Sequence, residues 1–341
     1  AIIQHNLLDR DLSADLAERE RAKLIQLEMM ENSYNNMLHQ KARIDWLKHG
    51  DANTKFFHSI IKSRRAKNAI NAVYNAQCTL LQTQDDIKRE FLNYFQGMIG
   101  TNIFTSSSVV SLRNILGKTI SVEDSKLLVA PITDAEILTA MKSINPNKSP
   151  GPDGFTSHFY IAAWELVGDD VLKAVHSFFR NANMLREINA TYIALVPKIS
   201  NPSLVKDYRP ISCCNTIYKC ISKILACRLR ECLPHIISSN QSAFVPGRLM
   251  AENILLAHDI VKGYNCNRTT PRCAMKVDIM KAFDSISWEF IHFTLQALGF
   301  PFVAWIMSCI TTTSFSIAIN GSHEGYFQGG RGIRQGDPLS P

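Results

Sequence analysis

Hydrophobic residues recur at helical spacing along most of the first hundred positions. Residues 12–49 carry Leu and Met every three or four positions between Glu, Arg and Lys, which predicts one long helix or two in succession. The same spacing predicts helices over 51–65 and near 85–97, with a short strand over 69–74 between them. The polar tract Thr101–Ser108 is the best candidate for a linker in the chain.

After this tract the pattern alternates between helices and strands. Thr133 and Glu136 form a capping box that begins a helix ending near Ile144. The runs 191–197 and 208–212 predict the two strands of a hairpin. Further helices are expected over 164–180, 217–233, 250–264 and 287–298, the last with Ser287 as N-cap and Gly299 at its end. Two prolines and two glycines make 147–155 a turn-rich loop.

The positive charge is concentrated in two segments. The whole chain carries a net charge of +7, and residues 190–270 hold ten Lys and Arg against four acids. Residues 55–67 hold five cations and no acid. Two basic segments indicate a polyanionic partner, with a solvated charged face as the alternative.

The nine cysteines show no C-x-x-C pair and no His at zinc-finger spacing, so buried thiols are favoured over a metal site. Their odd number and the lack of a signal sequence indicate a reducing compartment. No apolar run approaches the roughly 18 residues of a membrane span. Because the chain begins at Ala1 rather than Met, and stops directly after a Gly- and Pro-rich motif, we expect it to be a fragment.

The sharpest chemical candidate is Asp278. The apolar run before it predicts a short strand that delivers this carboxylate to the exposed edge of a sheet, where Mg²⁺ can be held together with substrate phosphates. Asp284 lies six residues further on and is not automatically a second ligand. The alternative is that Asp278 merely begins a turn.

Two further patterns suit an anionic ligand. Four glycines between Gly329 and Gly336 allow the backbone to approach a ligand closely, and Arg331, Arg334 and Gln335 supply donors. In the predicted hairpin, Lys198 lies near the turn and Arg209 on the returning strand, a pair of cations that suits a triphosphate. The alternatives are an ordinary turn and two exposed hairpin cations.

Taken together, these motifs resemble the reverse transcriptase of non-LTR (LINE-type) retrotransposons, most closely the plant lineage. In chain order they are the loop 147–155, Leu195–Lys198, Tyr208–Ser212, Asn240–Arg248, Asp278 with Lys281–Asp284, and Arg334–Pro341. The resemblance covers about Pro131–Pro341. Upstream, Trp46–His58 resembles the segment that links endonuclease to polymerase in the same elements.

The resemblance implies an α+β fold in which 109–341 form the fingers and part of the palm of a right-hand polymerase, preceded by a helical segment, 1–108. It implies two-metal nucleotidyl transfer to a DNA primer, with Mg²⁺, an RNA template, dNTPs and no membrane. The resemblance implies that Asp278 is the first metal-binding aspartate, with the backbone carbonyl of Ile279 as an accessory ligand. It implies that Phe283 is the steric gate that excludes a ribose 2′-OH. Lys198 and Arg209 would bind the triphosphate, and Gln335 and Gly336 would lie against the nucleotide and the template base.

One element of the family's site is missing. A complete site needs an adjacent Asp-Asp pair in a hairpin after the glycine-rich loop, whereas Asp85-Asp86 and Asp169-Asp170 lie upstream of Asp278 in predicted helices. We therefore expect this chain alone to be inactive. The alternatives are a non-catalytic nucleic-acid-binding remnant of a decayed element and a group II intron-type maturase, which would lack the Trp46–His58 signature. The element class implies a nuclear or cytoplasmic ribonucleoprotein; the sequence leaves the oligomeric state and the preferred RNA open.

Overall fold

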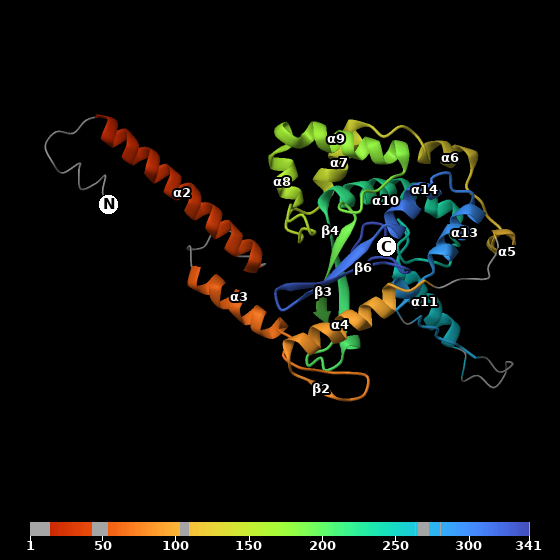
Figure 1. The fold of residues 1–341 in the computed structure, drawn as a ribbon. Helices are drawn as coiled ribbons and strands as arrows, with labels where there is room; N and C mark the ends of the chain where they lie inside the picture. The colour runs from red at the N-terminus through yellow and green to blue at the C-terminus, as the bar shows by residue number, and fades with distance from the viewer. Residues whose placement is uncertain are drawn as a thin grey trace. The chain divides into compact units, whose positions relative to one another are not determined.

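The computed structural model describes residues 14–42, 54–102, 109–262, 264, 273–279 and 281–340. The chain divides into two compact units, Ala1–Ala69 and Ile70–Pro341, which are described separately (Figure 1). The sequence predicts a boundary at the linker around 108 instead. The extent of the polymerase-like domain stays a prediction, but the compact unit of the structure already begins at Ile70.

The first unit is a pair of helices, α2 (Ala14–Ala42) and α3 (Thr54–Asn68). Leu38 and Phe57 are buried against each other, with Ile60 and Ile61 packed around them. Both predicted helices are confirmed. Residues 46–53 of the Trp46–His58 motif lie outside the described residues.

The second unit is built on a four-stranded sheet in the order β4-β3-β5-β6. β3 (Ala190–Pro197) runs antiparallel to β4 (Tyr208–Cys214) and parallel to β5 (Ser314–Ile319), which is antiparallel to β6 (Ser322–Gln328). The predicted hairpin is confirmed, with a 3-10 turn, η1 (Val205–Asp207), in its connection. A separate short pair joins β1 (Val73–Tyr74) to β2 (Leu80–Leu81).

One core lies between the sheet and α4 (Gln84–Ile99). The helix buries Ile87, Phe91 and Phe95 against strand residues that include Ile193 and Ile317. Because this apolar face of α4 packs on the sheet, the helix belongs to the second unit although it precedes the expected linker. Residues 103–108 of that linker are outside the described residues.

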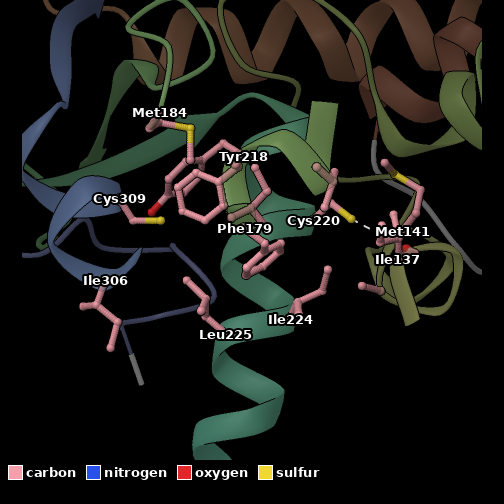
Figure 2. Close-up of a cluster of buried hydrophobic side chains, with 14 of the residues drawn as sticks. Ile137, Met141, Phe179, Met184, Tyr218, Cys220, Ile224, Leu225, Ile306 and Cys309 are labelled. Atoms are coloured by element: carbon pink, nitrogen blue, oxygen red, sulfur yellow. Dashed lines mark hydrogen bonds between the residues drawn. The ribbon is translucent and has the colours of Figure 1, made fainter. Parts of the chain in front are cut away.

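The larger core surrounds α10 (Thr216–Ile236) (Figure 2). Tyr218, Ile224 and Leu225 of α10 are buried with Phe179 and Cys309. The elements around it are α6 (Val122–Leu128), α7 (Asp134–Ser143), α8 (Ser157–Ala162), α9 (Trp164–Asn181) and α14 (Val303–Thr311). These helices and the sheet give a mixed helix-and-sheet domain, as the α+β expectation requires.

Most local helix signals in the sequence act as predicted, but only the Thr133 half of the capping box forms, because the Glu136 carboxylate accepts from Arg228 instead. The Thr133 hydroxyl accepts a hydrogen bond from the Glu136 amide at 3.2 Å and begins α7. Ser287 caps α13 (Trp288–Leu298) in the same way, and Gly299 ends it in the left-handed region at φ 82°. The remaining helices are α5 (Val109–Leu116), α11 (Met250–Val261) and the short α12 (Ala282–Ser285). Within the described ranges, no helix combines the length and the apolarity that crossing a bilayer requires.

The strand expected before Asp278 is not formed. Residues 273–279 belong to no helix or strand, and Met275, Val277 and Ile279 are 83, 75 and 71 % exposed. A strand needs a neighbour that accepts and donates its backbone hydrogen bonds. No strand among the described residues pairs with this run, so the β-like sequence forms no strand.

Candidate active site

The glycine-rich loop 329–336 is fastened to the turn that contains α12. The Gly332 amide donates to the Ile286 carbonyl at 2.8 Å, the Ile333 amide to the Phe283 carbonyl at 2.6 Å, and Trp288 Nε1 to the Gly332 carbonyl at 2.8 Å. Gly332 adopts φ +81°, and a Cβ there would lie 2.9 Å from the carbonyl oxygens of Phe283 and Asp284. The close approach therefore requires glycine at this position.

The other side of the loop is attached to the sheet. The Ser212 amide on β4 donates to the Gln335 carbonyl at 2.9 Å, and the Gly330 amide donates to the Ile99 carbonyl at the end of α4 at 2.7 Å. Gly336 then turns away at φ +95° and is exposed. The loop thus joins α4, α12 and β4 into one assembly.

Arg334 points inward rather than toward a ligand. Its guanidinium, 6 % exposed, donates to Asn189 Oδ1 at 2.7 Å and Thr191 Oγ1 at 3.0 Å, and pairs with Asp337 at 3.1 Å. It also lies over the Tyr218 ring, 3.8 Å from the centroid. Burial alone would lower the pKa of Arg334, but the acidic groups around it hold that pKa above its ordinary value.

This inward orientation corrects the expectation that both loop arginines serve as ligand donors. Arg331 is also occupied, because its guanidinium donates to the carbonyls of Gly97 and Met98 at the end of α4. Among the loop residues singled out from the sequence, half-buried Gln335 and exposed Gly336 remain for a ligand.

Gln335 is held by a carboxylate to which the sequence assigns no role. Its Nε2 donates to both carboxylate oxygens of Asp284, at 3.0 and 3.1 Å. Burial raises the pKa of Asp284, while the Gln335 hydrogen bond and the charges of Lys281 and Lys198 lower it. Lys281 itself donates to the Tyr94 hydroxyl of α4 at 2.7 Å.

The two hairpin cations share one face of the sheet. Arg209 pairs with Val196 across β3 and β4, and Lys198 follows Val196 by two positions. Both cations are exposed. The Lys198 Nζ donates to the Lys206 carbonyl at 2.7 Å, and Lys198 is near enough to Asp284 to influence its pKa.

The sequence-predicted residues are thus brought together only in part. Phe283, 38 % exposed, lies in the same turn as Asp284 and beside Gln335 and Gly336. Asp278 and Ile279 are exposed in the irregular segment before that turn. Reasoning from the sequence missed Asp284 as the partner of Gln335, since nothing local links positions 51 residues apart.

A pocket lies beside this assembly, between the loop and the sheet. Ile193 and Phe315 form part of its apolar wall, and Asp284, Thr313 and Gln335 are among its polar lining residues. No group of three or more His, Cys, Asp or Glu that could hold a metal ion occurs in the described part of the chain.

Residues 196–341, which contain the loop, the α12 turn and β4, match a family model described as reverse transcriptase (RNA-dependent DNA polymerase). The chain is 28 % identical over 335 residues to a protein named "Transposon TX1 uncharacterized 149 kDa protein" from Xenopus laevis, covering 97 % of this chain and 25 % of that protein. It is 29 % identical over 212 residues to the Pol polyprotein of the type-2 retrotransposable element R2DM of Drosophila melanogaster, covering 62 and 19 %. A type-1 R2 polyprotein of Popillia japonica is 30 % identical over 220 residues, covering 62 and 29 %.

The chain therefore spans about a quarter of the curated relatives' length. The family match lies on the same residues that build the loop, the α12 turn and the β4 edge. Residues 196–341 are thus similar to a reverse transcriptase domain, and the chain is similar to proteins named for the transposon TX1 and the retrotransposable element R2.

Proposed function

We propose that the protein is an RNA-directed DNA polymerase of a non-LTR retrotransposon, in which 109–341 supply the fingers and the first part of the palm. The observation that carries this proposal is the loop assembly, which leaves half-buried Gln335 and exposed Gly336 available to a ligand and bonds the loop to the turn that holds Phe283. The substrates would be an RNA template, a DNA primer and dNTPs. The plant lineage rests on the motif resemblance alone, since the relatives above come from a frog and two insects.

Lys198 and Arg209 would bind the incoming triphosphate. They project from one exposed face of the β3–β4 hairpin, where Arg offers paired donors and Lys a compact positive charge. Phe283 would exclude a ribose 2′-OH by contact with the sugar.

The Asp278 carboxylate and the Ile279 carbonyl are hard oxygen donors of the kind that Mg²⁺ binds. They fit the ion in chemical type, but one carboxylate is an incomplete set for two metal ions. We propose that an Asp-Asp hairpin encoded after residue 341 completes it. When bound, the ions would neutralise charge on the phosphates during transfer.

Primer extension tests the proposal, using the chain extended through that hairpin. Asp278→Ala should abolish dNTP incorporation on an RNA template, because an acid that binds the metal cannot be replaced by a methyl group. Asp259→Ala removes another exposed aspartate, on α11, and serves as the matched control. A fully active Asp278→Ala variant would refute the assignment.

The sugar gate has its own test. Phe283→Val should allow ribonucleotides to be incorporated, whereas Phe290→Val on α13, with 37 % exposure against 38 % for Phe283, should not. Unchanged sugar discrimination in the first variant removes Phe283 from this role. If the extended chain binds RNA in a salt-dependent way but never extends a primer, a non-catalytic binding module is the better description.

A further inference from the structure

Asp284 is an acid that the reaction chemistry of the proposed function does not use. It is 7 % exposed, at the centre of α12, and both of its carboxylate oxygens accept from Gln335 Nε2. An ionised carboxylate without compensating partners is expensive to bury. Its presence under the loop therefore calls for a reason.

The pairing fixes which end of the Gln335 amide faces inward. An ionised carboxylate accepts hydrogen bonds and cannot donate them, so only the NH₂ end of the amide can face Asp284. The Gln335 backbone is held independently by the Ser212 amide on β4 at 2.9 Å. With the backbone and the NH₂ both held, the amide oxygen Oε1 is turned away from Asp284.

We propose that Asp284 is a positioning residue, which orients the Gln335 amide so that its oxygen is presented as a hydrogen-bond acceptor to the incoming nucleotide. This inference rests on the proposed function. It assigns to Gln335 the recognition of a donor group, a hydroxyl or an N–H, rather than of a phosphate oxygen. The triphosphate oxygens are acceptors, and they would be left to Lys198 and Arg209.

Two lysines support the ionised state that this role needs. Burial has the largest effect on the pKa of Asp284 and raises it above its ordinary value, while Gln335, Lys281 and Lys198 act in the opposite direction and limit the rise. Lys281 is itself held beside Asp284 by Tyr94, through a hydrogen bond of 2.7 Å. The carboxylate thus has a cation on its own turn and another on the hairpin.

The simplest alternative is that Asp284 only ties the loop to the α12 turn. Backbone hydrogen bonds from Gly332 and Ile333 already make that connection at 2.8 and 2.6 Å. A purely structural tie predicts lower stability in variants, with no specific effect on nucleotide affinity. A positioning role predicts that changes at Asp284 act through Gln335.

The first test does not depend on catalysis. In the 341-residue chain with ¹⁵N-labelled glutamine side chains, the Gln335 NH₂ resonance is identified by its loss in Gln335→Met. Asp284→Asn should shift this resonance and accelerate rotation of the amide, while Ser285→Ala, on the same turn, should leave it unchanged. A Gln335 amide that is indifferent to Asp284→Asn overturns the proposal.

The second test is a double-mutant cycle in the extended, active chain. Asp284→Asn and Gln335→Met should each raise the KM for dNTP about three- to tenfold, the loss of roughly one hydrogen bond, with kcat and the KM for template-primer nearly unchanged. The double variant should be no worse than Gln335→Met alone. Additive effects would overturn the positioning role. An extended wild-type chain that does not polymerise would instead count against the proposed function, and the amide spectrum would still decide the orientation.

Discussion

The buried ion pair between Arg334 and Asp337 is the feature whose removal should cost the domain most stability. Asp337 is 3 % exposed, and its Oδ2 accepts from the Tyr218 hydroxyl at 2.6 Å and from Arg334 at 3.1 Å. Two changes of nearly constant volume separate these contacts. Asp337→Asn removes the charge, and Tyr218→Phe removes one hydroxyl while keeping the ring on which Arg334 lies.

The structure predicts different losses of unfolding free energy for Asp337→Asn and Tyr218→Phe. Removing one partner of a buried ion pair costs about 3–5 kcal/mol, because the other charge is left uncompensated. Arg334 would still donate to Asn189 Oδ1 at 2.7 Å and to Thr191 Oγ1 at 3.0 Å, so we expect about 3 kcal/mol for Asp337→Asn, near the lower limit. Tyr218→Phe deletes one hydrogen bond to a charged group and should cost about 1.5–2 kcal/mol.

Urea and thermal unfolding measure both losses, followed by the fluorescence of the four tryptophans, of which Trp164, Trp288 and Trp305 belong to the second unit. For a domain of this size, the melting temperature should fall by about 2–4 °C per kcal/mol. Asp337→Asn should therefore melt clearly below Tyr218→Phe. If Tyr218→Phe is equally or more destabilising, or if Asp337→Asn costs less than about 1 kcal/mol, Arg334 does not have the inward, ion-paired role described above.

Other expectations follow from single positions. Gly332→Ala should destabilise the domain by more than the roughly 1–2 kcal/mol that left-handed backbone strain alone costs, because its Cβ would also collide with two carbonyl oxygens. The control is Gly154→Ala, where φ is also positive at +76° but a Cβ meets nothing within 4 Å. The urea midpoints of the two variants measure the difference. The pKa of Asp284 in the folded chain lies above the ordinary value of 3.8, so ionisation of this group opposes folding. The free energy of unfolding of wild type should therefore fall relative to that of Asp284→Asn as the pH rises from about 4 to 7. A relative increase over this range would contradict the prediction. Maleimide should label the exposed thiols of Cys78, Cys227 and Cys273 but not the buried thiols of Cys220 and Cys232. Burial raises the pKa of Cys220 to about 12 and that of Cys232 to about 11, so little reactive thiolate is present. Rapid labelling of either buried thiol in the folded chain would contradict its placement.

The sequence predicted well those features that neighbouring residues determine. The Thr133 and Ser287 caps, the Gly299 helix end and the β3–β4 hairpin all depend on contacts within a few positions or across one turn, and all are present. The environment of Arg334 could not be predicted in this way. Its partner Asn189 lies 145 positions away, and a glycine-rich loop with two arginines is equally compatible with cations that face a ligand.

The difference between local and long-range contacts also explains why the segment before Asp278 forms no strand. Its residues have strand propensity, but a strand forms only where a neighbour completes the ladder, and propensity alone cannot supply one. The structure therefore leaves 273–279 exposed and outside any strand. For α4, the polar tract after the helix predicts a boundary, whereas the buried side chains of Phe91 and Phe95 connect the helix to the sheet.

The glycine-rich loop can be recognised from its own sequence, but its attachments depend on residues far along the chain. These attachments limit which groups the loop can present to a substrate. Its backbone is bonded to α4, the α12 turn and β4, and both of its arginines are turned to protein carbonyls or buried acceptors. Among the loop residues singled out from the sequence, half-buried Gln335 and exposed Gly336 remain for a ligand. A loop fixed on three sides can move these groups only if one of those attachments breaks. The affinity for a nucleotide should therefore depend on distant anchors such as Asp337 through the stability of the loop, and on Asp284 through the direction of a single amide.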